Sequence, residues 1–196
     1  MGKLIASMMT SLDGFIEARD RSLEWTVESA DFNAYCDAML DGADTLLFGR
    51  VSYEMMVAYW PAAEALPKDE WERRFARKMN AAPKVVLSRT LERVEWANTR
   101  IVSEHVAEEV GAIKARARRD CFVFGGARVI ASLLEHGLID EVRLIVHPVV
   151  LGGGTPLFAD GPAFRLQPLD FQRFDSGVVR MSYGVGGRLA AAERSG

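Results

Sequence analysis

Three apolar, strand-like runs in this sequence each stop at a small or hydroxyl residue next to a group that can contact phosphate. They are Leu-Leu-Phe-Gly-Arg at 46–50, Val-Val-Leu-Ser-Arg at 85–89 and Phe-Val-Phe-Gly-Gly at 122–126. Open α/β sheets bind ligands beyond the carboxyl ends of their parallel strands. Three such endings predict one extended anionic ligand that crosses several strands, and a dinucleotide has that length and charge.

Composition limits the fold and the partners. The chain has 196 residues, 49% of them hydrophobic, and we expect one domain over 1–186 with a flexible tail over 187–196. The net charge of −3 provides no broad basic surface for nucleic acid or an anionic membrane. Cys36 and Cys121 are far apart in the sequence, which favours buried free thiols in a cytoplasmic protein over a disulfide.

Strand and helix patterns alternate along the chain. Strands are expected near 3–9, 15–17, 45–48, 84–87, 100–102, 121–124 and 141–150, and helices near 31–41, 51–60 (ended by Pro61), 68–80, 104–119 and 127–135. Residues 166–174 and 178–185 are strand-like and flank a hairpin turn, Asp-Ser-Gly at 175–177. This order predicts an α/β fold with a mostly parallel mixed central sheet, an antiparallel C-terminal edge and helices on both faces.

The phosphate-binding elements are spread along the chain. Neither a Gly-x-Gly-x-x-Gly fingerprint after the first strand nor a Gly-x-x-x-x-Gly-Lys-Ser/Thr loop is present. Gly125 and Gly126 fit either an ordinary turn or a close approach of the backbone to a pyrophosphate. Arg50 and Arg89 offer guanidinium forks, and Ser88 adds a hydroxyl donor. Such arginines favour a cofactor with a 2′-phosphate, NADPH over NADH.

A set of motifs, taken in order, resembles a known superfamily. The motifs are Ser-Leu-Asp-Gly at 11–14, Leu-Phe-Gly-Arg-Val-Ser-Tyr-Glu at 47–54, Val-Leu-Ser-Arg-Thr at 86–90, Phe-Gly-Gly-Ala at 124–127, Leu-Ile-Asp-Glu-Val at 138–142 and Pro-Val-Val-Leu-Gly-Gly-Gly-Thr-Pro-Leu-Phe at 148–158. They resemble the dihydrofolate reductase-like superfamily, and within it the reductase domain of riboflavin-biosynthesis proteins, the RibD C-terminal domain, in a stand-alone form.

The resemblance implies a three-layer dihydrofolate reductase-like fold, a homodimer, and NADPH as cofactor. Its cofactor contacts carry over to Gly49, Arg50, Ser52, Leu87, Ser88, Arg89, Gly125, Gly126, Ala127 and Val129. It also implies a cis peptide between Gly125 and Gly126. The zinc ligands of the deaminase that accompanies this reductase in bifunctional proteins are absent from the sequence, so no metal site is expected.

The substrate side is less defined. In the superfamily a carboxylate follows a tryptophan at the start of the first helix, and Trp25, Asp31 and Tyr35 are similar to that arrangement. Asp31 is the candidate catalytic acid, with a pKa raised in an apolar cleft, and it equally fits a helix N-cap. Glu28 is an alternative in the same loop. His147 fits a buried core or interface histidine better than a proton donor.

The function expected is an NADPH-dependent reductase acting on a small-molecule substrate, a heterocycle such as 5-amino-6-(5-phosphoribosylamino)uracil. Reduction of dihydrofolate is an alternative expectation. A third is an NADP(H)-binding protein with little turnover.

Overall fold

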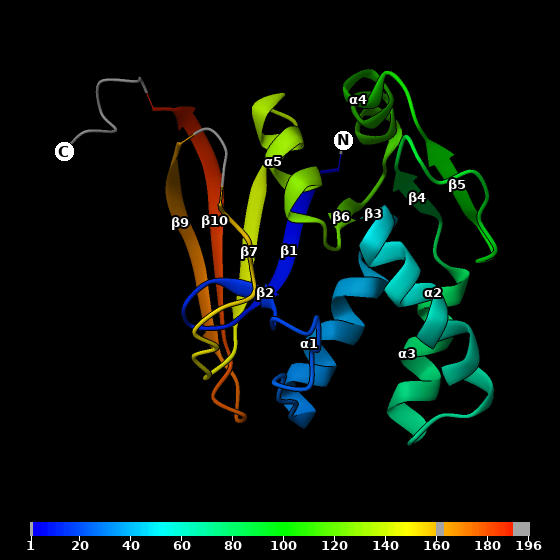
Figure 1. The fold of residues 1–196 in the computed structure, drawn as a ribbon, viewed down its shortest axis with the longest axis vertical. Helices are drawn as coiled ribbons and strands as arrows, with labels where there is room; N and C mark the ends of the chain where they lie inside the picture. Colours follow the sequence, from blue (N-terminus) through cyan, green and yellow to red (C-terminus); the bar gives the residue numbers. More distant parts are fainter. Residues whose placement is uncertain (1, 160–162, 190–196) are drawn as a thin grey trace.

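The computed structural model describes residues 2–159 and 163–189, and within these residues one mixed sheet has eight strands (Figure 1). Their order across the sheet is β5-β4-β3-β6-β1-β7-β10-β9. The strands are β1 Leu4–Thr10, β3 Ala43–Gly49, β4 Lys84–Leu87, β5 Thr99–Val102, β6 Asp120–Val123, β7 Glu141–Val146, β9 Phe164–Arg173 and β10 Val179–Arg188.

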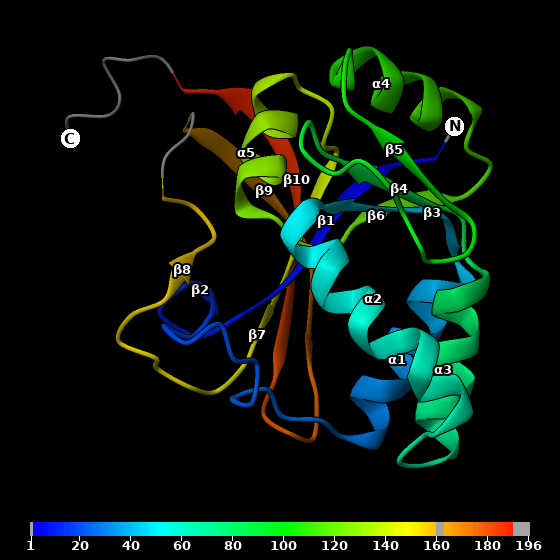
Figure 2. The same ribbon diagram turned by 45° about the vertical axis from the view of Figure 1, so that its right-hand side comes forward.

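Two short strands, β2 (Phe15–Glu17) and β8 (Thr155–Pro156), form a separate small antiparallel sheet. The helices are α1 Ala30–Asp41, α2 Arg50–Ala65, α3 Glu70–Ala81, α4 Val106–Arg116 and α5 Ala127–Glu135. Figure 2 shows α4 and α5 on one side of the main sheet and α1 and α3 on the other. None of the helices in the described ranges has both the length and the apolar character that crossing a membrane requires.

The core has two layers because side chains alternate between the two faces of each strand. In β1, Leu4 and Ala6 pack in a cluster with Val110 of α4 and Ile130 of α5. Ile5, between them, packs in the opposite cluster, which contains Phe32, Cys36, Phe75 and Met79 from α1 and α3. The layers confirm the expected helices on both faces, and both cysteines are buried free thiols, as predicted.

The sheet is parallel through its middle and antiparallel at one edge. β1 pairs in parallel with β6 and β7, and β3 with β4 and β6, whereas β10 is antiparallel to both β7 and β9. Gly177, with a φ of 85°, closes the predicted hairpin turn between β9 and β10. The carboxyl ends of the parallel strands therefore share one edge of the sheet, as the sequence predicted.

Several predicted boundaries were wrong. Helix α2 continues through Pro61 to Ala65, because packing of the Trp60 ring on Phe75, 5.0 Å between centroids, holds the last turns in place. Strand β7 ends at Val146, since the chain turns at His147 and the Pro148 nitrogen has no hydrogen to donate. Strand β10 reaches Arg188, inside the tail expected over 187–196, and residues 190–196 of that tail lie outside the described part of the chain.

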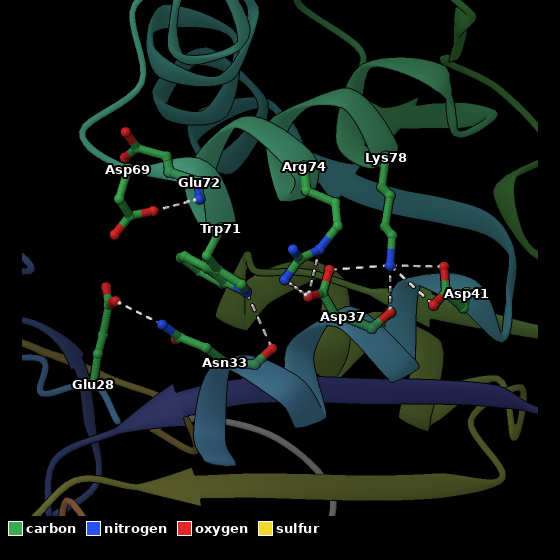
Figure 3. A network of polar contacts seen from close by, with 9 residues as sticks. All are labelled: Glu28, Asn33, Asp37, Asp41, Asp69, Trp71, Glu72, Arg74 and Lys78. Atoms are coloured by element: carbon green, nitrogen blue, oxygen red, sulfur yellow. Dashed lines mark hydrogen bonds and ion pairs between the residues drawn. The ribbon is translucent and has the colours of Figure 1, made fainter. Parts of the chain in front are cut away.

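A polar network fixes α1 against α3 (Figure 3). Asp37 of α1 pairs with Arg74 at 2.8 Å and with Lys78 at 3.0 Å, and Lys78 also pairs with Asp41 at 2.8 Å. The Arg74 and Lys78 side chains hold the pKa of Asp37 below its usual value, although burial alone would raise it. These ion pairs therefore hold helix α1, which carries Asp31 and Tyr35, against α3.

Candidate functional site

Two helices begin side by side at the carboxyl edge of the sheet. Gly49 ends β3 and is the N-cap of α2, and Gly126 follows β6 and is the N-cap of α5. A Cβ on Gly126 would lie 3.5 Å from the Cα of Gly49, so the two N-termini are adjacent. Neither N-cap has a side-chain hydrogen bond. Two uncapped helix N-termini present free N–H groups and positive dipole ends to the same space.

The residues around this space, Gly49, Ser52, Gly125 and Gly126, are here called the cradle. Glycine is required on both sides of it. Gly125 and Gly126 have φ values of 89° and 90°, a conformation that favours glycine. A Cβ on Gly125 would also overlap the Oγ of Ser52, which lies directly against that glycine. The expected cis peptide between the two glycines is wrong, since the described residues contain no cis peptide bond.

A cavity of about 680 Å³ opens beside the cradle, between the end of β4, the start of α4 and helix α5. Four predicted residues line it: Leu87, Ser88, Arg89 and Val129. The methyl Cγ2 of Val129 also lies 3.4 Å from where a Cβ on Gly126 would be. Val129 thus joins the cavity to the cradle, and the two form one continuous site. Ala127, also predicted, is the first residue of α5.

The positively charged side chains of this site differ in whether they have a hydrogen-bond or ion-pair partner. In the described residues, neither Arg89 nor Arg128, which both line the cavity, has a hydrogen-bond or ion-pair partner. Ser88 accepts hydrogen bonds from the N–H groups of Thr90 and Leu91, at 3.2 and 3.0 Å, which holds the start of the loop after β4. The Nη1 of Arg50, at the first position of α2, donates to both carboxylate oxygens of Glu54 at 2.9 and 3.0 Å.

The sequence reasoning missed part of the cavity wall. Arg128, Ser103 and His105 line the cavity and were not predicted as site residues. Arg128 had a usable signal, because it lies in the first turn of the helix after the two glycines. His105 is the N-cap of α4, with a φ of 49°, and its side chain makes no capping hydrogen bond.

On the substrate side, the structure corrects the expected environment of Asp31. The N-cap of α1 is Ser29, and Asp31 is a half-buried residue in the first turn. Its carboxylate accepts hydrogen bonds from the Ser29 hydroxyl, the Asp175 N–H at 3.0 Å and the Phe32 N–H at 2.8 Å. These bonds, that of Ser29 first, lower the pKa of Asp31, so the predicted raised pKa is wrong and the group is ionised at neutral pH.

The chain before α1 contacts the end of β7. The Val27 N–H donates to the Nδ1 of His147 at 3.1 Å, and the Trp25 ring meets the imidazole edge-on, 5.3 Å between centroids. His147 is fully buried, as predicted for a core histidine. Glu28, the alternative to Asp31, is exposed and accepts a weak hydrogen bond from Asn33 at 3.5 Å.

The model of the RibD C-terminal domain family matches residues 2–180. The chain belongs to the RibD C-terminal domain family. A curated relative, the uncharacterized protein YyaP of Bacillus subtilis (strain 168), is 33% identical to it over 183 residues, 92% of this chain and 94% of YyaP.

Solved structures agree with this membership. A putative riboflavin biosynthesis protein from Shewanella sp. PV-4 has a TM-score of 0.75 at 21% identity, covering 95% of this chain and all of that one. Dihydrofolate reductase from Enterococcus faecalis, complexed with NADP(H), has a TM-score of 0.57 at 16% identity, covering 96% and 98%. The dihydrofolate reductase-like fold is confirmed, and RibD family membership supports an oxidoreductase of this type.

Proposed function

We propose that this RibD family protein is an NADPH-dependent reductase whose cofactor lies across the cradle and the adjoining cavity. The observation that carries the proposal is the convergence of two uncapped helix N-termini at Gly49 and Gly126, next to a cavity whose two arginines have no partner among the described residues. Helix N-termini bind phosphate groups without any side chain, and arginine binds them through its fork. A dinucleotide needs both kinds of contact at neighbouring positions.

Two regions of the site would hold two different parts of the cofactor. The cradle residues would hold the pyrophosphate, where the absence of side chains on Gly49, Gly125 and Gly126 lets oxygen atoms approach the backbone. Ser88, Arg89 and Arg128 would hold the adenosine end, with the arginines on the 2′-phosphate. Arg50 would exchange its contact with Glu54, an exposed pair of small stability, for a phosphate oxygen.

When bound, the nicotinamide would supply the hydride, and the protein supplies orientation and a route for a proton. We keep Asp31 as the catalytic candidate. As an ionised carboxylate at the start of α1, it would act by orienting the substrate and by relaying a proton from water.

The substrate we propose is a small heterocycle of the type reduced in riboflavin biosynthesis, such as 5-amino-6-(5-phosphoribosylamino)uracil. RibD family membership and the Shewanella structure support this class. The buried free thiols Cys36 and Cys121 also favour a reducing compartment, and we place the protein in the cytoplasm.

Steady-state oxidation of NADPH, followed at 340 nm, tests this function. The purified protein would be given 5-amino-6-(5-phosphoribosylamino)uracil, dihydrofolate or no substrate, with NADPH binding measured separately by calorimetry. Turnover with the pyrimidine supports the proposal, and turnover with dihydrofolate alone supports a dihydrofolate reductase. NADPH binding without turnover on either compound indicates a binding protein, and absence of NADPH binding contradicts the cofactor assignment.

We further propose a homodimer through the β9 edge. In the described part of this strand, Leu169 and Phe171 are 53% and 57% exposed, an apolar pair at the open end of the sheet. Light scattering should give the mass of a dimer for the wild type and of a monomer for Leu169→Asp/Phe171→Asp. A monomeric wild type would contradict this proposal.

A further inference from the structure

Residues 22–29, here called the entry segment, connect β2 to α1 and carry Trp25. The segment has a turn of its own, in which the Thr26 N–H donates to the Leu23 carbonyl at 3.0 Å. Its contacts with distant residues are few: Val27 N–H to His147 Nδ1 at 3.1 Å, and Ser29 Oγ to Ser176 Oγ at 3.2 Å. A single hydrogen bond to His147 therefore fixes the middle of the entry segment.

The imidazole of His147 is enclosed by that segment and by helix α1. The Trp25 ring lies against it at 5.3 Å and an interplanar angle of 90°, and the Phe32 ring at 5.9 Å and 87°. Both contacts are edge-to-face, the arrangement that aromatic rings prefer. The His147 side chain thus contacts the entry segment and the start of α1, and its backbone directly follows the end of β7.

The hydrogen bond from Val27 determines the tautomer. Nδ1 accepts, so in the neutral ring the proton is on Nε2. Nε2 is buried, and within the described residues it has no hydrogen-bond partner. An unpaired buried donor costs about 1–3 kcal/mol, whereas a typical hydrogen bond contributes about 0.5–1.5 kcal/mol.

The hydrogen bonding of His147 therefore makes little or no net contribution to the stability of the fold. When the entry segment lies against His147, Nδ1 gains a partner while Nε2 is kept from water. The hydrogen bond at Nδ1 is therefore the polar contact that this side chain contributes, and it is made to the entry segment.

We propose that His147 is a positioning residue that, through its Nδ1 and its ring, docks the entry segment beside Asp31 on the substrate side of the site. This inference rests on the proposed reductase function, because it assigns the entry segment to substrate entry and retention. His147 acts through Val27 and Trp25, without touching the reacting atoms.

Three substitutions separate the roles of the ring. His147→Asn keeps an acceptor near the position of Nδ1, whereas His147→Leu keeps apolar bulk without an acceptor. Val27→Pro removes the donor N–H and leaves His147 intact. Val27 is 38% exposed and proline is also apolar and of similar size, so this change mainly removes the N–H.

The first measurement is amide hydrogen exchange of Val27 by NMR, which needs no enzymatic activity. We expect exchange to be about tenfold faster in His147→Leu, equivalent to 1.4 kcal/mol of lost protection, and within about threefold of wild type in His147→Asn. The Thr26 amide, bonded within the segment, is the internal control. Unchanged Val27 exchange in a folded His147→Leu protein, or equal acceleration in His147→Asn and His147→Leu, would overturn the docking role.

The second measurement is the KM for 5-amino-6-(5-phosphoribosylamino)uracil and the Kd for NADPH. His147→Leu and Val27→Pro should both raise the KM severalfold, His147→Asn should restore it, and the Kd for NADPH should not change. Faster Val27 exchange with an unchanged KM would overturn the assignment to substrate entry. If the wild type has no turnover, the reductase proposal fails, while the exchange data still decide whether His147 docks the segment.

Discussion

Gly49 and Gly126 face each other so closely that the Cα of Gly49 lies 3.5 Å from the point a Cβ on Gly126 would occupy. Gly49 ends β3 and Gly126 follows β6, and they cap different helices, so the sheet itself brings the two N-termini together. A phosphate group in this space would meet N–H groups from both helices. The space depends on glycine, and that dependence can be tested.

Gly125→Ala should abolish measurable NADPH binding or weaken it more than tenfold. The new Cβ would overlap the Ser52 side chain, and the φ of 89° is strained for alanine. Gly137→Ala is the matched control, because Gly137 also has a positive φ, 65°, but nothing lies within 4 Å of its Cβ position. Calorimetry with NADPH measures both, and equal losses in the two variants would show that the cradle has no special role.

Arg89→Ala and Arg128→Ala should each weaken NADPH binding about tenfold or more and change NADH binding less than threefold. Each arginine lacks another partner in the described residues, and a charge-assisted hydrogen bond to phosphate contributes about 1.5–3 kcal/mol. Arg93→Ala, also an exposed arginine near β4, is the control. An equal loss for both cofactors would contradict the assignment of these arginines to the 2′-phosphate.

Asp31→Asn should lower kcat with little effect on the Kd for NADPH, because Asp31 lies on α1, away from the cavity wall. The asparagine can still accept a hydrogen bond from the Asp175 N–H, so the fold should be retained. Glu135→Gln, an exposed change at the end of α5, is the control. A kcat equal to that of the wild type would leave Asp31 with a structural role at the start of α1.

The sequence was sufficient to predict which residues lie at the carboxyl edge of the sheet. It was not sufficient to predict contacts between residues far apart in the chain. The ends of β3, β4 and β6, at Gly49, Leu87 and Val123, could be predicted because apolar periodicity and the glycine or serine residues that follow are local signals. The hydrogen bonds of Asp31 to Asp175 and of Val27 to His147 join residues 144 and 120 positions apart. No local pattern encodes them. The pKa of Asp31 is lowered first by the hydroxyl of Ser29, two residues away, and further by the distant Asp175 N–H.

Lys84→Met should lower the free energy of unfolding by about 3 kcal/mol. The Lys84 side chain is 1% exposed, and its Nζ donates to the carbonyl oxygens of Met79, Asn80 and Ala82 at 2.8, 3.0 and 2.6 Å, at the end of α3. Methionine fills the volume but leaves these acceptors unpaired. Urea denaturation measures the loss, and Lys68→Met, at a side chain 78% exposed, should change stability by less than about 0.5 kcal/mol. Similar losses in both would contradict the capping role of Lys84.

Stability should fall as the pH is lowered from about 6.5 toward 4. Burial lowers the pKa of His147 from 6.5 to about 4, so in this range the unfolded chain binds a proton that the folded protein does not. The contribution is fully present above pH 6.5, and at most roughly 3 kcal/mol is lost by pH 4. Urea denaturation of wild type and His147→Leu at pH 7 and 4.5 isolates it; parallel losses in the two proteins would show that another group is responsible.

The hydrogen bond between Asp31 and the Asp175 N–H, with that between Ser29 and Ser176, ties the start of α1 to the β9–β10 turn. The hairpin at the sheet edge and the substrate side are therefore mechanically continuous. A coupling between two sites is reciprocal by thermodynamic linkage. In the proposed β9 homodimer, association that orders this turn and so favours substrate binding would itself be favoured by substrate, by the same factor.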